Sequence, residues 1–210
     1  MKLLTVGDSF TYGDELENVS RAWPFLLGQL LNYEVTNLGL SSGSNTQMLR
    51  KVIEHYKNYD LVIIAWTHFA RLEFSDFYGT FDIWPGCLNK LFDNKLQYRQ
   101  TLIEYITKHH DDIYLYKQYL INIILLQNFL KYHDKKYIMI DTFGNNQVRL
   151  LNSDLTDLVD PTYYLGWPIE SMMEWTYGTA QGPHGHFLEE GHEIVADKIY
   201  EHIRHLGWIS

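Results

Sequence analysis

The sequence predicts a single α/β domain in which helices cover both faces of a parallel β-sheet. Two observations lead to this fold class. Short apolar segments typical of buried strands occur at residues 3–6, 34–38, 61–65 and 137–140. Segments with helical spacing lie between them, and such alternation favours right-handed βαβ units. The 210 residues fit one domain, residues 1–210, because one hydrophobic core can extend over a chain of this length.

The helical segments have apolar residues on one face, as amphipathic helices do. Pro24 falls in the first turn of the first helix, where its missing N–H removes no hydrogen bond. The predicted helices occupy residues 23–31, 46–58, two segments within 95–132 that meet near 109–112, and 188–203.

Loops of unusual length or composition follow the predicted strands, at residues 7–21, 39–45, about 67–95 and 142–185. Ligands of open parallel sheets bind at the carboxyl ends of the strands, so we expect these loops to meet at one edge. The last two are insertions rich in aromatic residues. Their rings either line a pocket that stacks on a sugar or packs an acyl chain, or they anchor the loops or form an oligomer interface.

Composition argues against several partners. The net charge is −9 with histidine neutral, and no Lys/Arg cluster is present to bind nucleic-acid phosphates or an anionic membrane. The longest apolar run, residues 119–126, is far shorter than the roughly 18–20 residues of a membrane helix. The single cysteine, Cys87, excludes an intrachain disulfide, and the opening apolar run is too short for a signal peptide. We therefore expect a cytoplasmic protein, and the sequence leaves its oligomeric state open.

Two segments could carry chemistry together. Ser9 follows the first strand directly, within Gly7-Asp8-Ser9, and could present its hydroxyl to the crevice. Such a tripeptide by itself is equally typical of a turn or a helix N-cap. Because serine is a weak nucleophile without a base, the second segment matters: His186 lies just before the last helix and could reach the same edge.

Together these segments resemble the SGNH/GDSL hydrolase family, in the correct order over residues 3 to about 203. The resemblance implies a flavodoxin-like three-layer α/β/α sandwich with a parallel sheet of about five strands. It also implies a serine–histidine esterase that needs no metal or organic cofactor. The matching blocks are Gly7-Asp8-Ser9 with Gly13, Asn37-Leu38-Gly39 with Gly43-Ser44-Asn45, and His186 with Gly191-His192.

One departure concerns the oxyanion hole. The family's third block supplies an asparagine, and here Thr67 stands at that position. A threonine hydroxyl can donate a hydrogen bond to an oxyanion, but it can also rotate and donate elsewhere. The expected donors are the N–H groups of Ser9 and Gly43, with Asn45 or Thr67 as the third.

The second departure concerns the acid that orients the catalytic histidine. The family places an aspartate two or three residues before that histidine, and here these positions hold His184 and Pro183. The acid fixes the imidazole tautomer and stabilises the imidazolium. Its substitute would be His184, a backbone carbonyl, or a carboxylate from the 142–185 loop such as Asp160 or Glu174.

A rival interpretation is a metal site. His184, His186 and His192, with His68, could bind zinc, since three histidines suffice for a catalytic ion. No carboxylate–histidine signature accompanies them, and the resemblance gives His192 a structural role.

These residues predict an ester hydrolase that forms an acyl-enzyme on Ser9 with His186 as base. The expected substrate is a small-molecule or glycan ester, for example an O-acyl group on a carbohydrate. Two alternatives use the same fold: an acyltransferase with the same serine and histidine, and a weakly active or inactive binding module.

Overall fold

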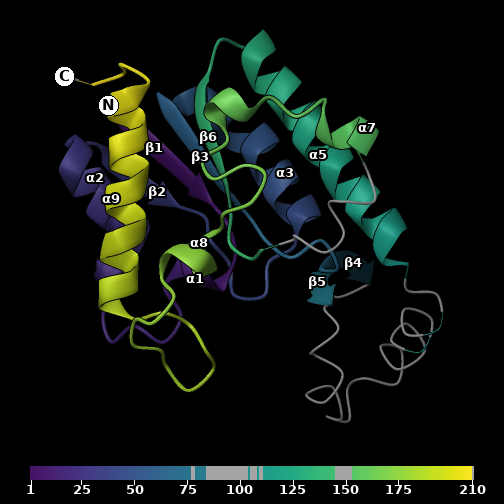
Figure 1. Cartoon of the computed structure of the whole chain (residues 1–210), viewed down its shortest axis with the longest axis horizontal. Coiled ribbons are helices and arrows are strands. Elements are labelled where there is room, and N and C mark those ends of the chain that lie inside the picture. The colour runs from purple at the N-terminus through teal and green to yellow at the C-terminus, as the bar shows by residue number, and fades with distance from the viewer. Residues whose placement is uncertain (77–78, 84–103, 105–107, 109–110, 145–152, 210) are drawn as a thin grey trace.

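The computed structural model describes residues 1–76, 79–83, 104, 108, 111–144 and 153–209 (Figure 1). A parallel sheet lies at its centre, with the strands in the order β2-β1-β3-β6. This confirms the predicted α/β fold. The strands are β1 (Lys2–Val6), β2 (Glu34–Asn37), β3 (Leu61–Trp66) and β6 (Lys136–Asp141).

The sheet has four strands in the described part of the chain, whereas the family resemblance implies about five. Next to β6, Tyr164 forms one isolated parallel bridge with Met139. The N–H of Leu165 donates to the Met139 carbonyl at 2.9 Å. The segment therefore lies along the edge of β6, but one bridge is too short to form a fifth strand.

Helices cover both faces of the sheet, as Figure 1 shows. Side chains of β3 alternate between the two faces because successive strand residues point in opposite directions. Val62 and Ile64 join the core beneath two helices, and Leu61 and Ile63 join the core on the other face. The helices are α3 (Asn45–His55) and α5 (Asp112–Tyr132) on the first face, and α2 (Trp23–Leu31) and α9 (Glu189–His205) on the second.

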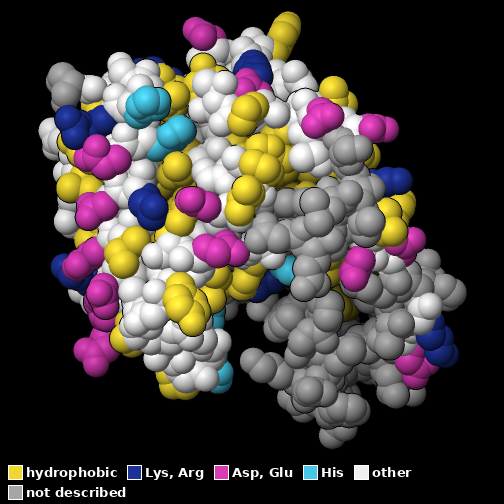
Figure 2. Space-filling model, viewed as in Figure 1, with side chains coloured by type: hydrophobic (Ala, Val, Ile, Leu, Met, Phe, Trp, Pro, Cys, Tyr) yellow, Lys and Arg dark blue, Asp and Glu magenta, His cyan; other side chains and the backbone are white. Residues whose placement is uncertain are grey.

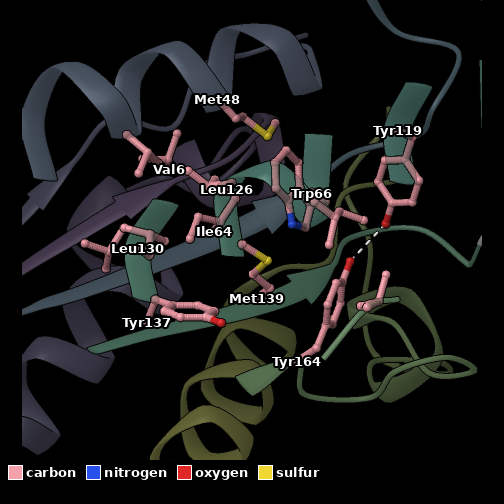
Figure 3. Close-up of a cluster of buried hydrophobic side chains, with 14 of the residues drawn as sticks. Val6, Met48, Ile64, Trp66, Tyr119, Leu126, Leu130, Tyr137, Met139 and Tyr164 are labelled. Carbon is pink, nitrogen blue, oxygen red and sulfur yellow. Dashed lines mark hydrogen bonds between the residues drawn. The ribbon is translucent and has the colours of Figure 1, made fainter. Parts of the chain in front are cut away.

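The first core surrounds the indole of Trp66, which is fully buried at the end of β3 (Figure 3). It also contains a polar pair: the hydroxyls of Tyr119 and Tyr164 lie 2.9 Å apart. Both hydroxyls also donate to the buried carboxylate of Asp141. These bonds satisfy polar groups that would be costly to bury alone, and they fasten the 161–165 segment to α5.

The remaining elements lie in the loops. The predicted irregular segment after β3 begins with an antiparallel hairpin of β4 (Leu72–Asp76) and β5 (Gly79–Ile83). The first of the two helices expected within 95–132, and Cys87, lie outside the described residues or almost entirely so. The short helices are α1 (Ser9–Tyr12), α7 (Ser153–Thr156) and α8 (Met172–Trp175), with 3-10 turns at Val19–Arg21, Tyr56–Asn58 and Pro161–Tyr163.

No described helix is both long enough and apolar enough to cross a bilayer. On the face seen in Figure 2, acidic side chains are spread widely, with Lys and Arg side chains interspersed among them.

Candidate active site

Ser9 is the first residue of α1, at the point where β1 ends. Asp8 caps this short helix, since its Oδ1 accepts from the N–H of Phe10 at 3.1 Å. Gly7 makes the turn possible: a Cβ there would lie 2.0 Å from Oγ1 of Thr11. The Gly-Asp-Ser segment therefore forms a tight strand-to-helix turn that holds Ser9 in place.

Ser9 and His186 line the same cleft, of about 490 Å³, at the carboxyl edge of the sheet. The ring of Phe10, which follows the serine, packs against the His186 ring with 4.6 Å between centroids. The two residues are 177 positions apart in the sequence, and the fold brings them to one site. The other cleft residues are Phe10, Asp14, Glu15, Ser41, Ser42, Arg71, Phe143, Met173, His184 and Gly185.

The carboxylate that contacts the ring of His186 belongs to Glu15. Its Oε2 lies 2.6 Å from Nδ1 of His186 and accepts from the N–H of His186 at 3.1 Å. Its Oε1 accepts from the N–H of His184 at 2.8 Å. Three donors from one loop therefore converge on a single carboxylate, whose side chain is only 11% exposed.

This arrangement fixes the state of both groups. Burial acts to raise the pKa of Glu15, but the hydrogen bonds from His184 and His186 outweigh it and hold that pKa below its ordinary value. At neutral pH the group is thus a carboxylate, which only accepts hydrogen bonds, so Nδ1 of His186 must carry the proton. Nε2 is then left as the acceptor, the state that a general base requires.

Glycines allow the histidine loop to approach Glu15 closely. A Cβ on Gly182 would lie 2.6 Å from Cδ and 2.9 Å from Cβ of Glu15, so only glycine fits without displacing the acid. Gly185 has φ +85°, a conformation that favours glycine. Glu15 itself has φ +69°, which is uncommon for a residue with a side chain. Strain of this kind persists where surrounding contacts enforce it, often at functional sites.

The other candidate orienting groups lie differently. The backbone N–H of His184 donates to Glu15, and this is the contact through which His184 contributes to the arrangement around His186. Asp160 lies outside the cleft: it forms an ion pair with Lys131 of α5 and accepts from the N–H of Thr162. Glu174 accepts from the hydroxyl of Ser171 in the turn that begins α8. The loop after α7 carries Asp160 towards α5, which is why that carboxylate does not reach the histidine.

Three of the expected oxyanion donors form hydrogen bonds within the protein. The N–H of Gly43 donates to the Leu40 carbonyl at 2.9 Å. The side-chain amide of Asn45 donates to the carbonyls of Thr67 and His68 at 3.2 and 3.4 Å. The Thr67 hydroxyl donates to Oδ2 of Asp8 at 2.6 Å. These three donors therefore already have partners, and none of the three residues lines the cleft.

The four histidines of the metal hypothesis do not come together. His192 is buried in the core, where Nδ1 accepts from the N–H of Trp23 at 3.1 Å. Burial lowers the pKa of His192 to about 3, which keeps the ring neutral. Nδ1 of His68 accepts from the N–H of Ala70. Among the described residues, no group of three His, Cys, Asp or Glu side chains is placed to hold a metal ion.

Most described aromatic residues of the two insertions pack within the fold. Phe69 contacts Tyr116 of α5, and Tyr163 stacks on Trp208 near the C-terminus. Phe143 instead lines the cleft beside Phe10, with 5.4 Å between ring centroids, and Tyr177 is exposed. Phe77, Tyr78 and Trp84, which belong to the first insertion, lie outside the described residues.

Sequence reasoning did not assign Glu15 or Arg71 to the cleft. Glu15 lies six positions after Ser9 and 171 positions before His186, and no sequence spacing relates it to that histidine. Arg71 lies four positions after Thr67, and its guanidinium carries a positive charge into the cleft. A charged side chain in a loop at the active edge was the only available signal for either residue.

The comparisons with known proteins support the fold. The model of a family described as a family of unknown function, DUF6071, matches residues 11–210. No curated protein sequence matches the chain significantly.

Several solved structures are similar to the chain. A putative lipolytic protein of the G-D-S-L family from Desulfitobacterium hafniense is 14% identical, with TM-score 0.56 and coverage of 96% of this chain and 98% of that one. TesA is 13% identical, with TM-score 0.61 and coverage of 98% and 99%. A family two carbohydrate esterase from Clostridium thermocellum, in complex with cellohexaose, is 15% identical, with TM-score 0.57 and coverage of 99% and 65%. At these identities the likeness is one of fold.

Proposed function

The chain belongs to DUF6071, a family of unknown function, and we propose that this member is a serine ester hydrolase. The observation that carries the proposal is the Glu15–His186 contact of 2.6 Å in the cleft that Ser9 also lines. Glu15 would provide the acid that is missing from the two positions before His186 where the family resemblance implies it. A buried carboxylate bonded to Nδ1, with a serine in the same cleft, is the constellation of serine hydrolases.

The reaction proceeds in two steps. Oγ of Ser9 attacks the ester carbonyl carbon while its proton passes to Nε2 of His186. The bond between the carbonyl carbon and the alcohol oxygen then breaks, and Nε2 returns the proton to that oxygen. Water repeats the sequence on the acyl-enzyme, which releases the carboxylic acid and restores the serine. Glu15 stays ionised throughout and stabilises the imidazolium that forms in each step.

The substrate that we propose is a small O-acyl ester, and a carbohydrate is its proposed carrier. The rings of Phe10 and Phe143 line the cleft together with polar groups of Asp14 and Ser42. This mixture suits an acyl group of few carbons joined to a polar alcohol. The fold similarity to carbohydrate esterases supports the choice of a sugar.

The test compares wild type, Ser9→Ala and Ser41→Ala in the hydrolysis of 4-nitrophenyl acetate and of an acetylated sugar. Ser41 is the matched control, because it lines the same cleft but its hydroxyl donates to Asp14. We expect Ser9→Ala to lose activity and Ser41→Ala to retain it. Labelling with a fluorophosphonate probe, which an inactive binding module would not undergo, should occur at Ser9. Equal hydrolysis by wild type and Ser9→Ala would overturn the proposal.

A further inference from the structure

We propose that the guanidinium of Arg71 donates a hydrogen bond to the oxyanion that forms during ester hydrolysis. It would replace the side-chain amide that SGNH/GDSL hydrolases use at this point. The inference rests on the proposed function. Three of the four residues expected to supply oxyanion donors, Gly43, Asn45 and Thr67, donate within the protein, and the fourth donor is the N–H of Ser9. A hydrolase with Ser9 as nucleophile needs a further donor near the carbonyl oxygen, because charge develops there in the transition state.

Among the described residues that line the cleft, Arg71 is the one Lys or Arg, and its planar guanidinium carries several N–H donors. Its side chain is 12% exposed, so the group lies largely within the protein. Glu73, two residues on, accepts a hydrogen bond from Arg50 of α3 at 2.6 Å, whereas Arg71 lines the cleft.

The contacts of Arg71 hold it beside the nucleophile. Nη1 lies 3.5 Å from Oδ2 of Asp8, the residue directly before Ser9. The guanidinium carbon lies 5.3 Å from the centre of the Phe143 ring, a cation–π distance. Phe143 contacts Phe10, which in turn packs on His186. The arginine thus contacts the residue before Ser9 directly and is connected to His186 through the rings of Phe143 and Phe10.

These contacts leave hydrogen-bonding capacity unused. Oδ1 of Asp8 already accepts from Phe10 N–H and Oδ2 from the Thr67 hydroxyl. Nη1 of Arg71 is buried and faces Oδ2 of Asp8 at 3.5 Å, an ion pair in which no described residue accepts a hydrogen bond from Nη1. A guanidinium has five N–H donors, so Arg71 can pair with Asp8 and, because it also lines the cleft, offer a donor to an oxygen that arrives with the ligand. A charged donor also makes a stronger hydrogen bond to an oxyanion than an amide does.

The experiment measures kcat and KM for 4-nitrophenyl acetate with wild type, Arg71→Met, Arg71→Lys and Arg50→Met. Arg50→Met is the matched control, since Arg50 forms ion pairs with Glu73 and Glu54 away from the cleft. We expect Arg71→Met to lower kcat by about 10²- to 10³-fold, the usual effect of losing one oxyanion donor, with KM changed less than about threefold. Arg71→Lys should recover part of kcat, and Arg50→Met should match wild type.

Two further measurements keep the result decisive. Mono-4-nitrophenyl succinate, which carries an anionic acyl group, is compared with the neutral acetate. If Arg71→Met raises KM for the succinate alone and leaves kcat for the acetate unchanged, Arg71 binds the anionic acyl group of the substrate and not the oxyanion. That result would overturn the inference. If Arg71→Met fails to fold because it leaves the Asp8 carboxylate without a cation, the same kinetics are measured for the double variant Asp8→Asn/Arg71→Met. Asp8→Asn alone is then the reference. Failure of the proposed function looks different, because wild type would then hydrolyse no faster than Ser9→Ala.

Discussion

Oε2 of Glu15 lies 2.6 Å from Nδ1 of His186, although 171 positions separate the two residues in the sequence. Glu15 follows the serine turn, and His186 precedes the last helix. In the family that the sequence resembles, the acid lies on the histidine's own loop. Here Glu15 lies on the loop that also carries Ser9, so the proposed acid and the proposed nucleophile move together if that loop shifts.

Replacing Glu15 by glutamine tests this contact. The amide keeps the size of the side chain but loses the charge that stabilises the imidazolium, and it can hold the wrong tautomer of His186. We expect kcat for 4-nitrophenyl acetate to fall by about two to four orders of magnitude. Glu17→Gln, which changes an exposed acid in the same loop, is the control. Equal activity in the two variants would rule out Glu15 as the orienting acid.

Gly182→Ala tests the approach of the histidine loop. The new Cβ would meet Cδ, Oε1 and Cβ of Glu15 at 2.6, 2.7 and 2.9 Å, so the carboxylate must move away from His186. We expect a loss of kcat of about tenfold or more, since small misplacements of catalytic groups are costly, with little change in the thermal midpoint. Gln181→Ala, at the exposed neighbouring position, should behave as wild type. An unchanged kcat in Gly182→Ala would show that Glu15 need not sit where it does.

The buried His192 predicts a specific acid sensitivity. Its pKa is lowered to about 3 by burial, against 6.5 for an ordinary histidine. Between these values the unfolded chain binds a proton that the folded protein does not, so the free energy of unfolding falls as pH is lowered from about 6.5. The slope contributed by one such group is at most about 1.4 kcal/mol per pH unit.

His192→Gln removes that group and keeps an acceptor that could serve the Trp23 N–H. Urea unfolding at pH 6, 5 and 4 should therefore show a shallower dependence on pH in His192→Gln than in wild type. His205→Gln, which removes an exposed histidine of the same helix, is compared in parallel. Identical slopes for wild type and His192→Gln would contradict the buried, neutral state of this histidine.

Two adjacent leucines of α5 test the packing of the first core. Leu126 is fully buried, whereas Leu125 is 58% exposed. We expect Leu126→Ala to lower the free energy of unfolding by about 2–5 kcal/mol, because it removes buried methyl groups and leaves a cavity. Leu125→Ala should change it by no more than about 0.5 kcal/mol. Equal effects in urea unfolding would mean that α5 presents a different face to the sheet.

The sequence by itself determined the layers of the fold. A short apolar run such as residues 61–65, bounded by polar residues, favours a strand covered on both faces. The predicted strands and the last helix match β1, β2, β3, β6 and α9 within about two residues. The order of the elements also predicts that Ser9 and His186 lie at one edge, because strand ends and helix starts in a parallel sheet meet there, and the family resemblance paired them as a site. The hairpin of β4 and β5 was not predicted, since its residues lack a clear alternation.

Only the tertiary structure decided which side chains complete the site. Glu15 reaches His186, Asp160 turns to Lys131, and Arg71 enters the cleft while Thr67 bonds Asp8. Each of these pairings joins segments at least 29 positions apart, or depends on the path of a loop between them. Hydrophobic periodicity fixes where strands and helices lie, but it carries no information on the direction of a polar side chain at a loop. That direction follows from distances of a few ångströms between packed loops, which the linear sequence does not contain.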